Sequence, residues 1–209
     1  MREIVGLLGF IGSGKSTVAE MLVQDHGFVS IAFAGALKDA VAAIFDWPRH
    51  MLEGDTKQSR EFRETVDENW QKTIGDIPLF NGKPVTPRYV LQLMGTEVFR
   101  NHFHSDIWVL AVLKKIEANP NTSYVITDAR FQNEINLLKN IGGQLIRVKR
   151  GDEPVWFDTA RNDPENMPVL YPNIHRSEWD WCVRTPDETI VNDGSLDDLR
   201  AKVNILFKG

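Results

Sequence analysis

Residues 9–16 constrain this chain more than any other stretch. They read Gly-Phe-Ile-Gly-Ser-Gly-Lys-Ser and fit the pattern G-x-x-x-x-G-K-[ST] at every fixed position. The apolar residues 3–8 before them predict a buried parallel strand, and residues 16–24 after them continue with helical spacing. Strand, glycine loop and helix are the context in which this pattern binds phosphate, so the sequence predicts a nucleoside triphosphate site here. The alternative is a glycine-rich turn that contains Lys and Ser by chance.

Each residue type in this glycine loop has a predicted task. The glycines let the backbone turn tightly and aim several N–H groups at one anion, and the dipole of the following helix adds to that field. Lys15 is expected to reach the β- and γ-phosphates, and Ser16 to hold Mg²⁺. The residues predicted to bind the triphosphate are Gly12, Ser13, Gly14, Lys15, Ser16 and Thr17.

The composition is typical of a soluble α/β chain. Its 209 residues, 42% of them hydrophobic, are enough to bury one large core. The net charge of −5 provides no positive field for DNA or RNA, so we expect no stable nucleic acid binding. The single cysteine, Cys182, excludes an internal disulfide and is best interpreted as a small buried residue. No apolar run approaches about 18 residues, so we expect no membrane segment and a cytoplasmic location.

Strand-like runs alternate with helical patterns along the chain. The predicted strands are residues 3–8, 28–33, 124–128, 144–149 and 188–192. Helices are expected to begin after Gly35, at Thr86-Pro87, at Ser105-Asp106, after Arg130 and at Ser195. Ser195 with Asp198 predicts a capping box for the last helix, whose expected core side is Leu196, Leu199, Val203 and Leu206. In the helix expected after Ser105-Asp106, the residues that repeat with helical spacing are Ile107, Leu110, Ala111 and Lys114.

We expect one domain over residues 1–209, with a core of about 1–46 and 105–209 and a substrate-binding insertion of about 47–104. Residues 47–85 are polar and lack sustained periodicity, which predicts a mobile region. Residues 151–172 are rich in Asp, Asn and Pro and also lack periodicity, as expected of a lid or a disordered loop. The predicted lid spans about 150–177.

Several polar residues are candidates for binding a substrate. Lys38 lies in the first turn of a helix, where it either faces an anion or is an ordinary solvated lysine. Arg60 and Arg63 lie close together, as a phosphate clamp requires, although a charge run is usually a solvated helix face. One helical face carries four residues that could bind a phosphate and a base edge, or could simply form a solvated face: Arg88, Gln92, Gly95 and Thr96. Trp108 is either a core residue or a surface on which a nucleobase stacks.

Asp128 ends the third predicted strand, and Arg130 follows it two residues later. Open α/β sheets place their chemistry at the carboxyl ends of strands. Asp128 can hold Mg²⁺ through water, orient Lys15 or bind a substrate hydroxyl, and Arg130 can stabilise phosphoryl charge during transfer. The alternative is a local ion pair between Asp128 and Arg130.

Ordered motifs across the chain carry a family resemblance. They are Gly35-Ala36-Leu37-Lys38-Asp39-Ala40, Arg63-Glu64-Thr65, Arg88 with Gln92-Leu93-Met94-Gly95-Thr96, Trp108-Val109, Asp128-Ala129-Arg130 with Glu134, and Asn192-Asp193-Gly194-Ser195-Leu196. In this order the chain resembles the bacteriophage deoxynucleoside monophosphate kinases, within the P-loop nucleoside monophosphate kinases. The resemblance implies a three-layer α/β fold, in which a five-stranded, mainly parallel sheet has helices on both faces and carries a substrate-binding insertion and a lid.

The resemblance also implies an activity, the transfer of the γ-phosphoryl group of ATP to deoxynucleoside 5′-monophosphates for DNA precursor synthesis. Lys15, Arg130 and Asp128 are then the expected catalytic residues. The implied substrate contacts are Lys38, Arg63, Arg88, Gln92, Gly95, Thr96, Trp108, Asp128, Arg130 and Glu134. ATP and Mg²⁺ are the implied cofactors. A homodimer is compatible with the family, and a phage-encoded chain would act in the host cytoplasm.

The chain also departs from the family pattern. Ile11 and Gly12 stand where relatives can carry basic residues in the loop, and residues 47–85 form a short region for the family. No role is assigned to residues 175–178, and which basic residue of the lid acts in transfer stays open. The alternatives are a P-loop kinase for another small substrate, such as phosphomevalonate or dephospho-coenzyme A, and a regulatory nucleotide-binding ATPase module.

Overall fold

The computed structural model describes residues 2–208 and divides the chain into two compact units. One unit contains the residues up to Phe33 and those from Val112 onward, and the other is Ala34–Ala111. The second unit therefore starts before, and ends after, the predicted insertion of about 47–104. Within residues 2–208, no helix has both the length and the apolar character that crossing a bilayer requires.

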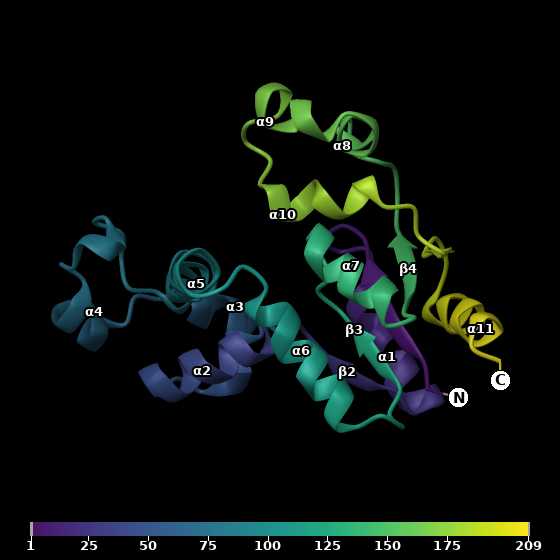
Figure 1. Cartoon of the computed structure of the whole chain (residues 1–209), viewed down its shortest axis with the longest axis horizontal. Helices are drawn as coiled ribbons and strands as arrows, with labels where there is room; N and C mark the ends of the chain where they lie inside the picture. Colours follow the sequence, from purple (N-terminus) through teal and green to yellow (C-terminus); the bar gives the residue numbers. More distant parts are fainter. Residues whose placement is uncertain (1, 209) are drawn as a thin grey trace. The chain divides into compact units, whose positions relative to one another are not determined.

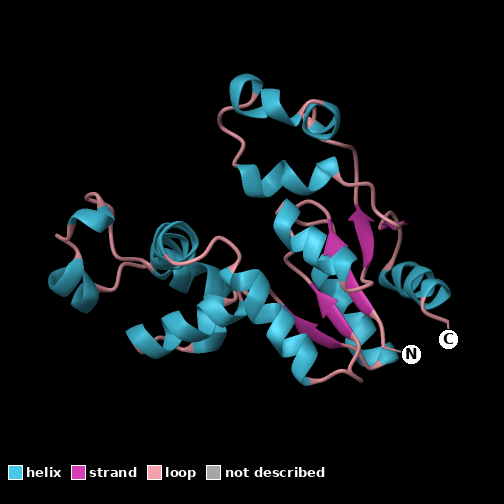
Figure 2. Ribbon diagram, in the orientation of Figure 1, coloured by secondary structure: helices cyan, strands magenta, loops and turns pink. Residues whose placement is uncertain are grey.

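The first unit is built on a five-stranded sheet (Figure 2). Its strands are β1 (Ile4–Leu8), β2 (Val29–Ile31), β3 (Tyr124–Ile126), β4 (Gln144–Lys149) and β5 (Glu188–Val191). Their order is β2-β3-β1-β4-β5, and every neighbouring pair is parallel. The five predicted strands are therefore confirmed, and the strand before the glycine loop lies at the centre of the sheet.

Helices cover both faces of this sheet. Val5 and Leu7 of β1 belong to a buried cluster with α1 (Lys15–His26) and α11 (Leu196–Leu206). Gly6 points to the opposite face, where a Cβ atom would lie 2.5 Å from Cδ1 of Leu138 in α7 (Gln132–Asn140). The predicted three-layer α/β architecture is therefore confirmed.

Short helices follow the carboxyl end of β4 (Figure 1). They are α8 (Phe157–Asn162), η4 (Pro164–Asn166), α9 (Met167–Leu170), α10 (Arg176–Trp179) and η5 (Asp180–Val183). The alternative of a disordered loop over 151–172 is wrong, because short helices form there, and the alternative of a lid stays a prediction. Helices of three to six residues are too short to display an apolar period, although Ala160 and Met167 are fully buried. We call residues 150–183, which contain the predicted lid, the lid segment.

Helices joined by loops make up the second unit, and no strand occurs within its residues 34–111. It contains α2 (Gly35–Phe45), η1 (Arg49–Leu52), α3 (Lys57–Glu64), α4 (Glu68–Ile74), η2 (Pro78–Phe80), α5 (Pro87–Gln92) and the π-helix η3 (Leu93–Arg100), and the division between the units falls within α6 (Ile107–Ala118). Residues 47–85, which lack sustained periodicity, form η1, α3, α4 and η2, and the mobility expected of this region stays a prediction. Of its helices, α3 buries only Ser59 and α4 buries no residue, so neither has an apolar stripe in the sequence.

Two predicted helix caps are confirmed. The Thr86 hydroxyl accepts a hydrogen bond from the Tyr89 N–H at 3.2 Å, and Ser195 with Asp198 forms the expected capping box. One predicted core position is wrong, because Leu196 is 68% exposed. Leu196 is the first residue of α11, and the buried residues of this helix, Leu199 and Val203, lie further along it.

Cys182 lies in η5 and is buried, as predicted. Burial raises the pKa of its thiol to about 12, which outweighs the opposing effect of the Arg147 charge.

Candidate active site

The glycine loop lies at the carboxyl end of β1, and its glycines are required by its geometry. Gly9 has φ 141°, and a Cβ atom there would lie 2.4 Å from the carbonyl oxygen of Val148. Gly14 has φ 105°, and a Cβ atom there would lie 2.5 Å from Nδ2 of Asn192. The same Asn192 amide donates a hydrogen bond to the Ser13 carbonyl oxygen at 2.9 Å. The loop is thus held between β4 and the end of β5 in a conformation that other residues cannot adopt.

Lys15 is folded back onto the loop. Its Nζ donates hydrogen bonds to the carbonyl oxygens of Gly9, at 2.7 Å, and of Phe10, at 2.9 Å. Burial and the Arg130 charge lower the pKa of Lys15 to about 8, although the Glu178 carboxylate acts to raise it. The side chain is therefore a desolvated ammonium group with donor capacity left for an anion.

A cavity of about 420 Å³ opens beside the loop. Its lining includes Gly12, Lys15, Ser16, Arg150 and Asn192. The hydroxyl of Ser13, in the same loop, is buried and has no hydrogen-bond partner within residues 2–208. Loop N–H groups, an ammonium, a guanidinium and hydroxyl groups form a donor set that suits a polyphosphate. The residues present therefore fit a bound triphosphate, and Ser16 supplies the kind of oxygen ligand that Mg²⁺ takes.

Asp128, Arg130 and Glu134 follow β3, which pairs with β1 in parallel, so they lie at the same edge of the sheet as the loop. Asp128 Oδ1 accepts a hydrogen bond from the Phe33 N–H at 2.7 Å. Arg130 Nη1 lies 3.6 Å from Oε1 of Glu178 in α10. Glu134 is 2% exposed, and its Oε2 accepts the N–H groups of Arg130 and Phe131. Glu134 therefore fixes the backbone that carries Arg130.

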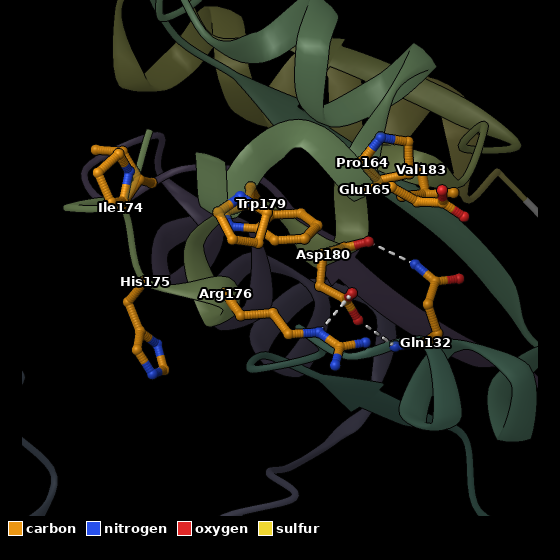
Figure 3. Close-up of a pocket in the computed structure, with 11 residues that line it drawn as sticks. Gln132, Pro164, Glu165, Ile174, His175, Arg176, Trp179, Asp180 and Val183 are labelled. Atoms are coloured by element: carbon orange, nitrogen blue, oxygen red, sulfur yellow. Dashed lines mark hydrogen bonds and ion pairs between the residues drawn. The ribbon is translucent and has the colours of Figure 1, made fainter. Parts of the chain in front are cut away.

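The start of α7 is joined to the lid segment by Asp180. Its carboxylate accepts hydrogen bonds from the Gln132 N–H at 2.9 Å and from Arg176 Nε at 3.0 Å (Figure 3). These three residues lie on the wall of a second, mostly apolar cavity of about 600 Å³, which also includes Trp179. Residues 175–178 had no predicted role, and they contribute one ion pair to Arg130 and another to Asp180.

In the second unit, the basic residues predicted to bind substrate already contact acidic or carbonyl groups. Lys38 Nζ lies 2.6 Å from Glu53 Oε2, and Arg63 donates a hydrogen bond to the Glu53 carbonyl oxygen at 3.2 Å. Arg88 forms an ion pair with Glu64. Burial acts to raise the pKa of Glu53, but hydrogen bonds from Lys38 and Arg49 outweigh it, and the net pKa lies below the ordinary value.

The π-helix η3 brings Gly95 against its neighbours. A Cβ atom at Gly95 would lie 2.7 Å from Cδ2 of Leu37, and the Gly95 carbonyl oxygen accepts the indole N–H of Trp108 at 3.0 Å. Trp108 is 6% exposed, so the structure supports the core interpretation of this residue. Thr96 of η3 is exposed, and so is Gln92, the last residue of α5. Their predicted substrate contacts, and that of Trp108, stay predictions.

Sequence reasoning missed several residues of the loop's surroundings. Arg150 and Asn192 line the loop cavity, Glu178 reaches Arg130, and the Phe10 ring packs on the lid segment. Arg150 follows β4 and Asn192 follows β5, so their positions at strand carboxyl ends were a usable signal. The contact of Glu178 had no local signal, because it depends on how the lid segment folds back.

Together, a parallel sheet with the order β2-β3-β1-β4-β5, a glycine loop between β1 and α1, and a basic cavity at that loop define a P-loop kinase fold. Among solved structures, a dephospho-CoA kinase from Campylobacter jejuni superposes with a TM-score of 0.50 at 14% identity, covering 99% of this chain and 96% of that one. At this identity the likeness concerns the fold alone.

Sequence comparison gives the family. The family model for deoxynucleotide monophosphate kinase matches residues 49–203, and this chain belongs to that family. A putative deoxynucleotide monophosphate kinase of Acanthamoeba polyphaga mimivirus is 32% identical over 161 residues, which cover 70% of this chain and 74% of that protein. The deoxynucleoside-5′-monophosphate kinase of Escherichia phage T5 is 42% identical over 114 residues, covering 52% of this chain and 43% of the phage protein.

Proposed function

We propose that this chain transfers the γ-phosphoryl group of ATP to deoxynucleoside 5′-monophosphates, giving ADP and deoxynucleoside diphosphates. Membership of the deoxynucleotide monophosphate kinase family supports the reaction. The proposal that ATP is the phosphoryl donor rests on the position of Lys15. This residue places a desolvated ammonium group on the wall of the cavity beside the glycine loop. A regulatory module that only holds a nucleotide has no need of the acidic and basic residues beside β3.

The chemistry that we propose is in-line transfer without a covalent enzyme intermediate, because phosphoryl transfer needs positioning and charge neutralisation. The loop N–H groups and Lys15 hold the triphosphate, and Arg130 compensates charge on the transferring group. Ser16 would hold Mg²⁺, which neutralises charge on the phosphates when it is bound. Asp128, fixed by the Phe33 N–H, orients donors at the end of β3.

For the acceptor, we propose the residues that the family resemblance assigns. Lys38, Arg63 and Arg88 provide positive charge for a monophosphate, and Gln92 at the end of α5 and Thr96 in the π-helix η3 are exposed. Glu134 acts in this proposal through the backbone of Arg130, which its carboxylate holds. We further propose that the protein acts in a cytoplasm without stable binding to nucleic acid.

The test measures ADP release from ATP and Mg²⁺ with each of the four common deoxynucleoside monophosphates, with their ribonucleotide counterparts and without acceptor. We expect release to depend on a deoxynucleotide, and the rates rank the bases that are accepted. Release that does not depend on an acceptor would contradict the proposal and favour an ATPase module. Activity only with phosphomevalonate or dephospho-coenzyme A, included as further acceptors, would contradict the substrate class.

A further inference from the structure

A cluster of aromatic rings joins the glycine loop to the lid segment. The ring centroid of Phe10, in the loop, lies 5.3 Å from that of Trp156 with an interplanar angle of 87°. It also lies 6.0 Å from the ring of Phe157 and 5.0 Å from the ring of Trp181. Edge-to-face contacts at such distances are favourable beyond the area they bury. One side chain of the loop therefore contacts three rings of the lid segment, and neither resemblance nor motif assigned it a role.

Arg147 supplies the cluster with a fixed cation. Its guanidinium carbon lies 4.6 Å from the Phe157 ring centroid, 5.4 Å from that of Trp181 and 5.8 Å from that of Phe10. Its side chain is 10% exposed and is paired with Glu153 at 2.5 Å. Since Arg147 is in β4, opposite Leu8 of β1, its backbone belongs to the sheet. The rings are therefore gathered around a charge that the sheet holds in place.

Phe10 is also one of the two residues that hold Lys15. The Phe10 carbonyl oxygen accepts a hydrogen bond from Lys15 Nζ, while the Phe10 ring packs on the lid segment. An ammonium group has three N–H donors, and two of them are used by the loop carbonyls of Gly9 and Phe10. Phosphate oxygens that approach Lys15 compete for these donors. Nucleotide binding therefore acts on the backbone of the residue whose ring touches the lid segment.

We propose that Phe10 is a positioning residue that couples occupancy of the glycine loop by a nucleotide to the arrangement of the lid segment. The release or tightening of the Lys15 bond to the Phe10 carbonyl changes the orientation of the Phe10 ring. This reorientation in turn shifts the three rings that pack on Phe10, which are those of Trp156, Phe157 and Trp181. Arg147, held in the sheet, keeps its position among them. A lid segment coupled in this way closes on a filled loop and keeps water from the transferring group. This last consequence rests on the proposed kinase function, whereas the coupling itself does not.

The coupling is tested by tryptophan fluorescence, because Trp156 and Trp181 are partners of Phe10. The full chain is titrated with ADP and Mg²⁺, and binding is followed in parallel by calorimetry. We expect a change of emission in the wild type that Phe10→Leu removes while calorimetric affinity stays within about threefold, since leucine fills the space without a ring. Phe10→Tyr keeps the ring and is expected to restore the change.

Phe207→Leu is the matched control. The Phe207 ring packs at 5.5 Å on Phe28 in the same unit, remote in sequence from the loop and the lid segment. It loses a ring of the same size, and we expect it to keep the wild-type emission change. An unchanged emission response in Phe10→Leu, or equal loss in Phe207→Leu, would overturn the proposal.

A second measurement compares hydrolysis with transfer. In Phe10→Leu we expect acceptor-independent ADP release, divided by transfer to the acceptor, to rise about tenfold, because misplaced lid residues admit water. A ratio equal to that of the wild type would contradict the coupling. If the wild type phosphorylates no deoxynucleoside monophosphate, the proposed function fails, but the fluorescence titration with ADP still decides whether Phe10 couples loop and lid segment.

Discussion

In the unit that contains the sheet, Lys15 is held by two neutral carbonyl groups, whereas in the helical unit Lys38 and Arg88 are paired with carboxylates. An anion that binds Lys15 displaces carbonyl oxygens, which carry only partial charge. An anion that binds Arg88 must compete with a full negative charge of Glu64. The two units therefore differ in what a phosphate has to replace.

This difference has an energetic consequence. Lys15 is desolvated, so a phosphate that reaches it gains an interaction in a site where water screens little. Arg88 and Glu64 are 50% and 58% exposed, and an ion pair of that exposure contributes about 0–1 kcal/mol. We expect the loop cation to dominate turnover, and the cations of the helical unit to adjust acceptor affinity in smaller steps.

The largest expected effect is that of Lys15→Ala. Removal of the ammonium group should lower kcat by about 10³-fold, since a preorganised charge in a desolvated site is lost. The two loop hydrogen bonds of Lys15 are lost as well, at about 1 kcal/mol each in stability, so the fold should persist. Steady-state kinetics and thermal unfolding measure both quantities. Near-normal turnover in this variant would contradict the expectation that the loop cation contributes more to turnover than the cations of the helical unit do.

The pH dependence of ADP binding tests the desolvated state of Lys15. Below its pKa of about 8 the side chain is charged, and above that pH the free protein loses the proton that phosphate binding requires. Calorimetry should therefore give a constant Kd up to about pH 8 and an increase of about tenfold per pH unit beyond it.

Removing either charged neighbour of Lys15 should shift the pH at which Kd begins to rise, which we call the bend, and the two shifts should be in opposite directions. Glu178→Gln removes a carboxylate that raises the pKa of Lys15, so the bend should move to lower pH. Arg130→Gln removes a cation that lowers this pKa, so the bend should move to higher pH. Shifts in the same direction would contradict the assigned electrostatics.

One cap in each unit offers a matched comparison of local stability. Thr86→Ala removes the hydroxyl that accepts the Tyr89 N–H, and Ser195→Ala removes the capping box of α11. Each change should cost about 1 kcal/mol, read as faster amide hydrogen exchange in α5 or in α11 respectively. Thr86→Ser keeps the hydroxyl and should exchange as the wild type does. Protection that is lost in both helices with either variant would mean that the caps do not act locally.

The smallest expected effect is that of Glu64→Gln. Without its carboxylate partner, Arg88 is released for the acceptor phosphate, and KM for the deoxynucleotide should fall about two- to threefold. Glu117→Gln breaks a comparable exposed pair, with Lys114, and should leave KM unchanged. A KM that rises in Glu64→Gln would indicate that Glu64 itself contacts the acceptor.

The sheet unit could be predicted well because its elements are long or have strong local signals. The glycine loop, the five strands and the capping box of Ser195 each depend on neighbouring residues, and each is confirmed. The expected ammonium role of Lys15 is compatible with its place on the wall of the loop cavity. Its bonds to the Gly9 and Phe10 carbonyls lay beyond sequence reasoning, since they depend on loop geometry.

Residues 47–85 and the lid segment were harder to predict for a physical reason. The short helices α3 and α4 bury almost none of their residues, and α4 packs through the ring of its own Trp70, which contacts Phe45, the stacking partner of Trp47. Such contacts between aromatic rings have no fixed sequence spacing. Three further points remain predictions, because they depend on how residues distant in the sequence are arranged in space. They are the limits of the insertion, the catalytic assignment of Arg130 and the acceptor contacts.

The buried thiol of Cys182 makes this chain a convenient object for site-specific labelling. Maleimide and iodoacetamide reagents attack the thiolate, and with a pKa of about 12 and 2% exposure this thiol remains protonated and inaccessible at neutral pH. A cysteine introduced at an exposed position, such as Val155 or Val169 of the lid segment, would therefore be the one group that reacts. Single-dye or paired-dye reporters of lid movement can be attached without first removing the native cysteine.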